Sequence, residues 1–449
     1  MTKGNGTCAQ PRRKRVVYLD YNSTAPVNPK ATSAAEKWES LRVPANPSSD
    51  TPTAVEMQKE IERAGEALRK RYGFCTDKRD TKTCTVLWNS GASEGNSHVI
   101  RGCVDAWWAR RNANQKKLPS VLIGSTEHKA SILCAQELEK QGRARAVFVD
   151  VHHGMTPSEV DAVLEKATKK AGGSGRVVLL SVMTFNNETG GCYPQGHLRA
   201  WAHRRKVPFH ADDTQALGKR SSNSVHRPAF VTGSFHKLGG PVGAGFLLVN
   251  SAHPGFRRVM GSSDLEALPA QVHGAQQSGV RGGTMDVATI ASCMAALQDF
   301  PAPGKWASHC RRLRKALLDR LRKEHGMEVK YREPGDKSAC GEEHVAVLTP
   351  MDTGLENTLL MSLFEPNKKF CNVKLKRRLI DAGFIVSVGS ACNTNSKNAS
   401  HVLKALWPND KCLWRGVLRV STGPGTTLQE VRDFADAYAK IVKNGCYLD

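Results

Sequence analysis

The chain has 449 residues, of which 40% are hydrophobic and 24% charged, and this size and composition indicate a large globular protein with more than one domain. Lys and Arg number 65 against 42 Asp and Glu, for a formal net charge of +23. No apolar run approaches the ~20 residues that a membrane span requires, so we expect a soluble protein with no membrane partner.

The positive charge has two interpretations. It can attract nucleic acid or other anionic partners, or it can be the solvated surface of an enzyme that binds anionic ligands. Basic runs occur at 11–15 and 374–378, but neither zinc-finger spacing nor an RNP-like aromatic motif accompanies them. We therefore expect nucleic acid not to be the primary partner, and we predict no metal site.

The 13 cysteines are an odd number at irregular spacings, which favours reduced thiols over a disulfide framework. The basic N-terminus lacks the apolar stretch of a secretory signal. We expect a cytoplasmic protein in a reducing compartment, with a mitochondrial or nuclear location left open.

In chain order, the first 290 residues alternate between strand-like apolar runs and helical patterns. A short strand begins at Val16, and a capping box of Thr156 and Glu159 marks the start of one helix. The strand-like runs lie in 16–29, 83–102, 120–131, 145–151, 176–191 and 207–215, and helical patterns lie in the thirties, at 53–72, after residues 91 and 128, at 156–173 and at 197–206.

This alternation predicts an α/β fold with a mostly parallel sheet and helices on both faces. Ligands of such sheets bind outside the carboxyl ends of the strands. His128, Asn187, Asp212 and Gln215 all fall at predicted strand ends, so we expect the site there.

After residue 290 the pattern changes to a basic helix at 311–324 followed by scattered strands and helices. We predict a large domain of residues 33–289 and a smaller α+β domain formed by 1–32 and 290–449. The strands are expected in 343–348, 384–392 and 416–421, and the helices at 373–382, 400–407 and 427–443, the last with a capping box of Thr427 and Glu430.

The segment 207–249 places an acid, Asp212, at the end of an apolar run, and His236 and Lys237 follow before a glycine-rich turn. A pyridoxal 5'-phosphate (PLP) enzyme needs a lysine for a Schiff base and a carboxylate that keeps the pyridine nitrogen protonated. The Gly-Ala-Ser turn ending at Ser93 starts a predicted helix and suits a phosphate.

These motifs resemble those of the cysteine desulfurases and selenocysteine lyases, in the class V aminotransferase branch of fold-type I PLP enzymes. The resemblance covers roughly residues 16–300 and 380–435, and its pieces occur in family order. They are YLDYNSTAP (18–26), NPSS (46–49), SGASE (90–94), TEHKA (126–130), NNETGG (186–191), HADDTQALGK (210–219), SFHKLGGPVGAG (234–245), VRGGT (280–284), VGSAC (388–392) and LRVSTG (418–423).

The resemblance implies a fold-type I transferase with a seven-stranded-type sheet, and it implies roles for individual residues. Lys237 forms the Schiff base, His128 stacks on the pyridine ring, and Asp212 pairs with the ring nitrogen. Gln215 donates to the phenolic oxygen, with Asn187 nearby. The phosphate is bound by Ser93, Ser234, His236 and, from a neighbouring subunit, Thr284, so a homodimer is expected.

On the substrate side, the resemblance assigns Arg419 and Asn46 to the carboxylate and Cys392 to the nucleophile that takes sulfur as a persulfide. The chain departs from the family pattern at Val388, which replaces a serine, and at Asp213, where the family often has a small residue. Asp213 therefore stays open as a second candidate for the partner of the ring nitrogen, after Asp212. The segment 273–279 also replaces a glycine-rich stretch.

The leading hypothesis is a cysteine desulfurase that converts L-cysteine to L-alanine and an enzyme persulfide on Cys392. Its sulfur would serve iron–sulfur cluster assembly or tRNA thiolation through a sulfur-acceptor or scaffold protein. One alternative is a selenocysteine lyase, and another is a non-catalytic PLP-fold scaffold or nucleic-acid-binding protein.

Overall fold

The computed structural model describes residues 16–41, 45–74, 83–110, 117–220, 225–336, 344–364, 371–388, 400–410, 413 and 417–445. The predicted nucleophile Cys392 and the basic run at 11–15 lie outside these residues. Among the described residues, no helix is long and apolar enough to cross a membrane.

A seven-stranded sheet forms the centre of the larger part of the molecule, in the order β2-β8-β7-β6-β5-β3-β4. Only β8 runs antiparallel to its neighbours β2 and β7. The predicted mostly parallel sheet is therefore confirmed. Its strands are β2 (Cys84–Asn89), β3 (Ser120–Gly124), β4 (Arg145–Val149), β5 (Val177–Ser181), β6 (Phe209–Asp212), β7 (Phe230–Ser234) and β8 (Gly245–Asn250).

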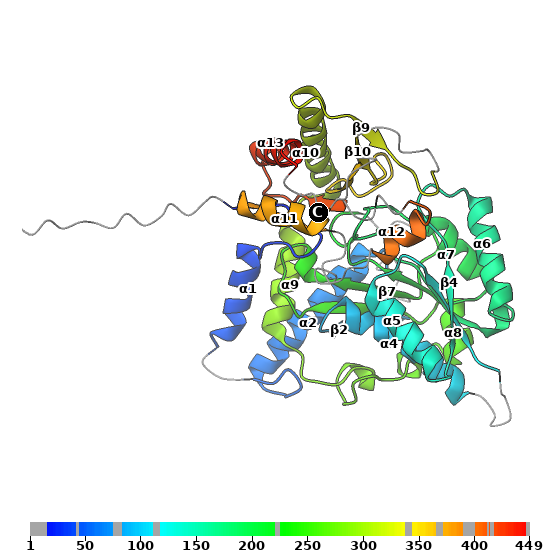
Figure 1. Cartoon of the computed structure of the whole chain (residues 1–449). Helices are drawn as coiled ribbons and strands as arrows, with labels where there is room; N and C mark the ends of the chain where they lie inside the picture. The colour runs from blue at the N-terminus through cyan, green and yellow to red at the C-terminus, as the bar shows by residue number, and fades with distance from the viewer. Residues whose placement is uncertain are drawn as a thin grey trace, which may run out of the picture.

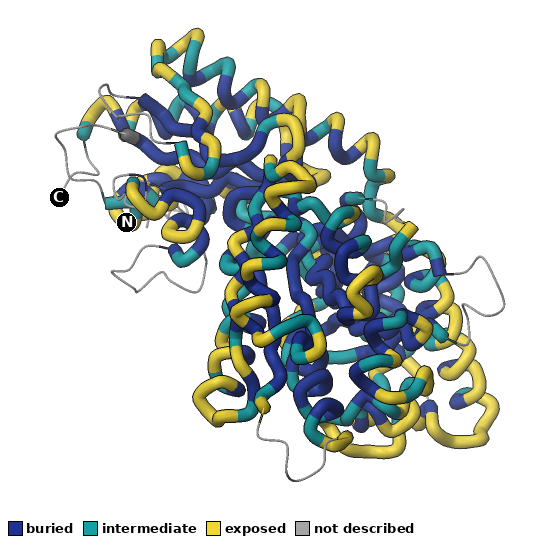
Figure 2. The backbone as a smooth tube through the Cα atoms, turned by 90° about the vertical axis from the view of Figure 1, so that its right-hand side faces the viewer, coloured by how far each residue is buried: buried dark blue, intermediate teal, exposed yellow. Residues whose placement is uncertain are grey.

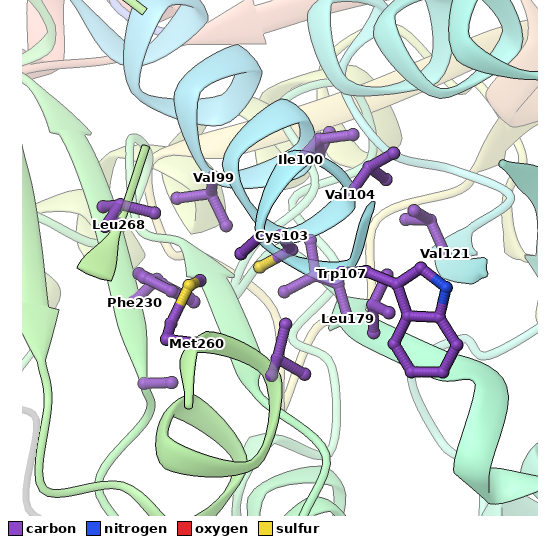
Figure 3. Close-up of a cluster of buried hydrophobic side chains, with 14 of the residues drawn as sticks. Val99, Ile100, Cys103, Val104, Trp107, Val121, Leu179, Phe230, Met260 and Leu268 are labelled. Atoms are coloured by element: carbon purple, nitrogen blue, oxygen red, sulfur yellow. The ribbon is translucent and has the colours of Figure 1, made fainter. Parts of the chain in front are cut away.

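One face of this sheet packs against helices α4, α5 and α8. Because side chains alternate along a strand, Val121 and Ile123 of β3 face this side, with Phe230 and Leu247 from neighbouring strands. Figure 3 shows the α4 side chains lying over this face. The helices are α4 (Ala92–Ala109), α5 (Lys129–Lys140) and α8 (Pro254–Met260).

The intervening residues point to the opposite face. Leu248 and Val231 pack against α1, α2 and α9, and Leu122 and Leu180 pack against α6 and α7. Burial on both faces explains why these strands read as continuous apolar runs. The helices are α1 (Pro29–Glu39), α2 (Pro52–Arg71), α6 (Pro157–Lys170), α7 (Gln195–Arg204) and α9 (Val287–Asp299).

A second, four-stranded sheet has the order β13-β11-β10-β9 and packs through an apolar core against α10, α11 and α13. Figure 1 shows α10, α13 and β10 at the top of the molecule, above α4 and α5. These elements are β9 (Val329–Tyr331), β10 (His344–Val347), β11 (Thr358–Phe364), β13 (Val417–Ser421), α10 (Pro303–Lys323), α11 (Asn372–Asp381) and α13 (Leu428–Lys443).

A short parallel pair, β1 (Val17–Tyr18) and β12 (Phe384–Ile385), joins the start of the chain to this part. The seven-stranded sheet lies wholly within residues 33–289 and the other strands lie outside them. The exact domain boundary remains a prediction.

The sequence predicted most elements, including both capping boxes. It predicted no strand for β7, β8, β9 or β11. The β11 segment shows no strict alternation of apolar and polar residues, because this strand lies inside its sheet and is buried. The prediction also started α10 too late, since the helix begins at Pro303. The expected strand at 384–392 is shorter among the described residues, and the helix α12 (His401–Leu406) follows the undescribed segment. Figure 2 shows the buried strands inside and the exposed outer sides of the helices.

Candidate active site

A cavity of about 380 Å³ lies at the carboxyl ends of β5 and β6, next to the start of α4. The structure brings most of the predicted site residues together in its lining. They are Ser93, His128, Asn187, Asp212, Gln215, Ser234, His236, Lys237 and Arg419.

Lys237 ends the 3₁₀ turn η2 (Phe235–Lys237) that follows β7. Its Nζ donates to the carbonyl oxygens of Asn22 at 2.8 Å and Ser23 at 2.6 Å. The loop after β1 can approach this closely because Gly239 has a φ of 94°, and a Cβ there would lie 3.0 Å from the Pro26 carbonyl oxygen. The glycine-rich turn therefore positions the amine at the cavity wall.

Asp212 is buried at the end of β6, where its carboxylate lines the cavity. Its Oδ2 accepts from Asn96 Nδ2 at 2.8 Å, and its Oδ1 accepts from the Thr214 amide at 3.0 Å. Asn96, on α4, accepts in turn from the Thr232 hydroxyl at 2.5 Å. These bonds fix one carboxylate orientation, so the side chain is preorganised to meet a cation.

Two of the three histidines in the cavity lining, His128 and His236, were predicted. The His128 Nδ1 accepts from the Ala130 amide at 3.2 Å as the cap of α5, which places its proton on Nε2. Burial lowers the pKa of His128, although the Asp212 charge opposes this effect. Burial and then the Lys237 charge lower the pKa of His236 to about 4. Both imidazoles are therefore neutral at neutral pH.

The start of α4 faces the same cavity. Its first residue is preceded by Gly91, with a φ of 144° and no side-chain cap, so its first amide groups have no capping acceptor from Gly91. Ser93, Ser234 and His236 surround this helix end. Amides, hydroxyls and the helix dipole together make an anion site there.

Arg419 comes from β13 of the smaller sheet and is 1% exposed. Its guanidinium donates to Asp20 Oδ1 at 2.6 Å and to the Asn187 carbonyl oxygen at 2.8 Å. The cation is thus held rigidly at the cavity by groups from two other parts of the chain, an arrangement suited to bidentate recognition of a carboxylate.

Asn22 connects Lys237 and Gln215 through its backbone carbonyl oxygen. Asn22 belongs to a recognised motif, residues 18–26, but the sequence predicted no role for it. Its side chain donates to Thr358 Oγ1 at 2.7 Å, and its carbonyl oxygen accepts from Lys237 and, at 3.0 Å, from Gln215. The Gln215 Oε1 accepts from Lys219 Nζ at 3.2 Å. Burial lowers the pKa of Lys219 to about 7.

Sequence reasoning also missed two residues in the cavity lining, Glu188 and His401. Burial raises the pKa of Glu188, and the His401 Nε2 donates to the Glu127 carbonyl oxygen at 2.9 Å. The acid inside NNETGG was a visible signal for the first. No local pattern marks the second, because α12 reaches the cavity only in the folded chain.

Two predicted residues are not in the cavity lining. The Asn46 Oδ1 accepts from the Ser48 amide at 2.9 Å in a loop, and Thr284 is exposed. The sequence assigned Thr284 to the phosphate site of a neighbouring subunit, so the structure of a single chain does not test its role. Cys392 lies outside the described residues, and the roles of all three stay predictions.

The donor set fits PLP, the group that the resemblance implies. The cavity offers an amine on Lys237, a buried carboxylate on Asp212 and an anion site at α4 in one continuous lining. The buried Thr214 hydroxyl also lines it and has no hydrogen-bond partner among the described residues.

The fold and this site define a class. Residues 17–349 match the aminotransferase class-V family, and the chain belongs to that family. The resemblance to the cysteine desulfurases is confirmed by curated relatives. The chain is 28% identical over 437 residues to the cysteine desulfurase IscS of Pseudoalteromonas translucida, covering 96% of this chain and 93% of that one.

The chain is also 27% identical to a mitosomal cysteine desulfurase of Trachipleistophora hominis, over 95% of this chain and 86% of that one. Solved structures share its fold. A NifS-like protein superposes with a TM-score of 0.73 at 21% identity, covering 96% of this chain and all of that one. The cysteine desulfurase CsdA of Escherichia coli gives 0.66 at 20% identity, with 96% and 95% covered.

Proposed function

We propose that this protein is a PLP-dependent cysteine desulfurase. The observation that carries the proposal is the convergence of the Lys237 amine, the Asp212 carboxylate and the Arg419 guanidinium on one cavity. These groups match the needs of a cofactor with a cationic ring and a substrate with a carboxylate. The relatives named as cysteine desulfurases align over nearly the whole chain.

Bound PLP supplies an electron sink that makes the Cα proton of an amino acid acidic. Asp212 would keep the ring nitrogen protonated, and Asn96 holds Asp212 in place for this task through their 2.8 Å bond. Neutral His128 would help to hold the cofactor ring. The start of α4, with Ser93, Ser234 and His236, would hold the phosphate.

Arg419 binds the substrate carboxylate, and its bond to Asp20 keeps the guanidinium from rotating. Lys237 Nζ then carries the proton away from Cα, since its position at the cavity wall is set by two backbone carbonyls. A fixed proton carrier beside a fixed carboxylate clamp contributes through orientation.

Sulfur transfer requires a thiolate nucleophile, and we assign it to Cys392. The Cys392 thiolate attacks the substrate sulfur, an S–S bond forms as the substrate C–S bond breaks, and the carbon skeleton leaves as L-alanine after protonation. The persulfide would then pass to an acceptor protein. A homodimer completed by Thr284 of a second copy belongs to the same proposal, as does a reducing compartment.

The test is turnover of L-cysteine and L-selenocysteine by the purified protein, followed by alanine release. Wild type is compared with Cys392→Ala and with Cys371→Ala, a half-buried thiol before α11 that serves as the matched control. We expect cysteine turnover that is lost only in Cys392→Ala. Turnover of selenocysteine alone, unaffected by Cys392→Ala, would instead identify a selenocysteine lyase.

A further inference from the structure

A second cavity, of about 500 Å³, lies behind the first one. Side chains alternate at the end of β6, so Asp212 faces the α4 side while Asp213 faces the side of α2 and α7. Phe185 lines both cavities and separates them. The second cavity contains none of the groups assigned to PLP or cysteine.

Three arginines line this cavity: Arg71 from α2, Arg199 from α7 and Arg220. Arg199 is 5% exposed. Among the described residues, its side chain makes no hydrogen bond or ion pair, and its Nε is buried without a partner. A buried guanidinium without a direct ion pair is destabilising, and burial lowers the pKa of Arg199 although the Asp213 charge opposes this.

The carboxylates near the cavity neutralise these cations only in part. Glu356 is shared between Arg220, at 2.9 Å, and Arg311, at 3.1 Å. Arg71 forms no ion pair with any described residue. Asp352 lies exposed at the margin. The cavity therefore carries excess positive charge.

Asp213 is the other acid in the lining, and it is occupied by neutral donors. It accepts from the Thr184 hydroxyl and interacts with Tyr72. Burial raises the pKa of Asp213, although the Arg199 charge opposes this. The two residues do not form a direct ion pair in the described chain, which leaves the Arg199 guanidinium facing the cavity.

We propose that this cavity binds a small oxyanion, a molecule with a carboxylate or phosphate group, held by Arg199 and Arg71 with Arg220 beside them. Guanidinium groups bind both kinds of oxyanion through paired N–H donors. The volume suits a small metabolite. This site goes beyond the proposed function, because neither cofactor nor substrate enters it.

The test is calorimetric titration of the cofactor-loaded protein with inorganic phosphate at about 0.15 M salt, where exposed charges are screened. Arg199→Gln is compared with Arg204→Gln, an exposed arginine on the same helix. We expect one site in wild type and Arg204→Gln, and affinity at least about tenfold weaker in Arg199→Gln. Arg71→Gln, on a partly exposed residue, gives the same loss if Arg199→Gln does not fold.

Succinate is titrated in an Arg419→Gln background, so that the catalytic cavity offers no guanidinium to a carboxylate. Binding of succinate alone would identify a carboxylate site, and binding of phosphate alone a phosphate site. If phosphate does not bind wild type and succinate does not bind Arg419→Gln, or if Arg199→Gln and Arg71→Gln bind as tightly as Arg204→Gln, the proposal is overturned.

Discussion

The two cavities at the end of β6 differ in how their charges are balanced. In the catalytic cavity, Arg419 meets Asp20, Asp212 meets Asn96, and Lys237 meets two backbone carbonyls. In the cavity behind it, the buried Arg199 forms no direct ion pair with a described residue, and the nearby Asp213 only opposes the effect of its burial.

The two cavities differ in whether the protein itself neutralises the charged groups that line them. The catalytic groups are held by the protein itself before any ligand arrives, which is the preorganisation that a reaction needs. The rear cavity leaves a guanidinium for a ligand to neutralise. Removal of a charged side chain should therefore destabilise the protein when the residue lies in the catalytic cavity and stabilise it when the residue is Arg199.

The largest effect is expected for Lys237→Ala. Removal of the amine should abolish the visible cofactor absorbance and reduce cysteine turnover by about 10³-fold or more, because the same residue holds the cofactor and moves the proton. Absorbance spectra and alanine release measure both, with Lys140→Ala on the exposed end of α5 as the control. Retained absorbance would contradict the assignment.

Arg419→Lys should lower kcat/KM for cysteine by about 10- to 100-fold, since a lysine cannot donate to Asp20 and a carboxylate with the same forked geometry. The cofactor spectrum should persist. Steady-state kinetics would show this against Arg432→Lys, an exposed arginine on α13. Equal kinetics in the two variants would show that Arg419 does not bind the substrate carboxylate.

Lys219, which donates to Gln215 of the catalytic cavity, provides a test of how burial affects a cation. Its pKa is lowered to about 7 in the folded protein, so between pH 7 and about 10.4 the unfolded chain binds more protons and stability rises with pH. This gain is at most about 1.4 kcal/mol per pH unit. Thermal unfolding at pH 7 and 9 should show a smaller gain in Lys219→Met than in wild type, and an equal gain would refute the shift.

The smallest effect is expected for Arg199→Met in buffer without multivalent anions. Replacement of an unpaired buried charge by an apolar side chain of similar length should raise the stability by about 1 kcal/mol. Arg419→Met, which leaves the partly buried Asp20 without its cation, should lower the stability. The melting temperatures of the two variants measure this difference. A loss of stability in both variants would show that the two cavities do not differ in how their charges are balanced.

Much of this site was predictable because its residues occur in local motifs. Lys237 and His236 share one glycine-rich turn, and Asp212 and Gln215 share one strand end. Asn96 was not predictable, because an asparagine inside an ordinary helix pattern gives no sign that it contacts a carboxylate on β6. His401 was not predicted either, because no local pattern shows that α12 reaches the cavity.

The sequence alone determined the alternation of buried strands and capped helices, and with it the parallel sheet and the end of that sheet where ligands bind. These properties depend on hydrophobic spacing and turn chemistry over a few neighbouring residues. Charge balance was decided only by the tertiary structure. Asp20 and Arg419 are far apart in sequence, yet Asp20 Oδ1 and Arg419 Nη2 lie 2.6 Å apart. Arg199 forms no ion pair with a described residue, although the Asp213 charge opposes the lowering of its pKa by burial. The reason is that ion pairing depends on distances that only the folded chain sets.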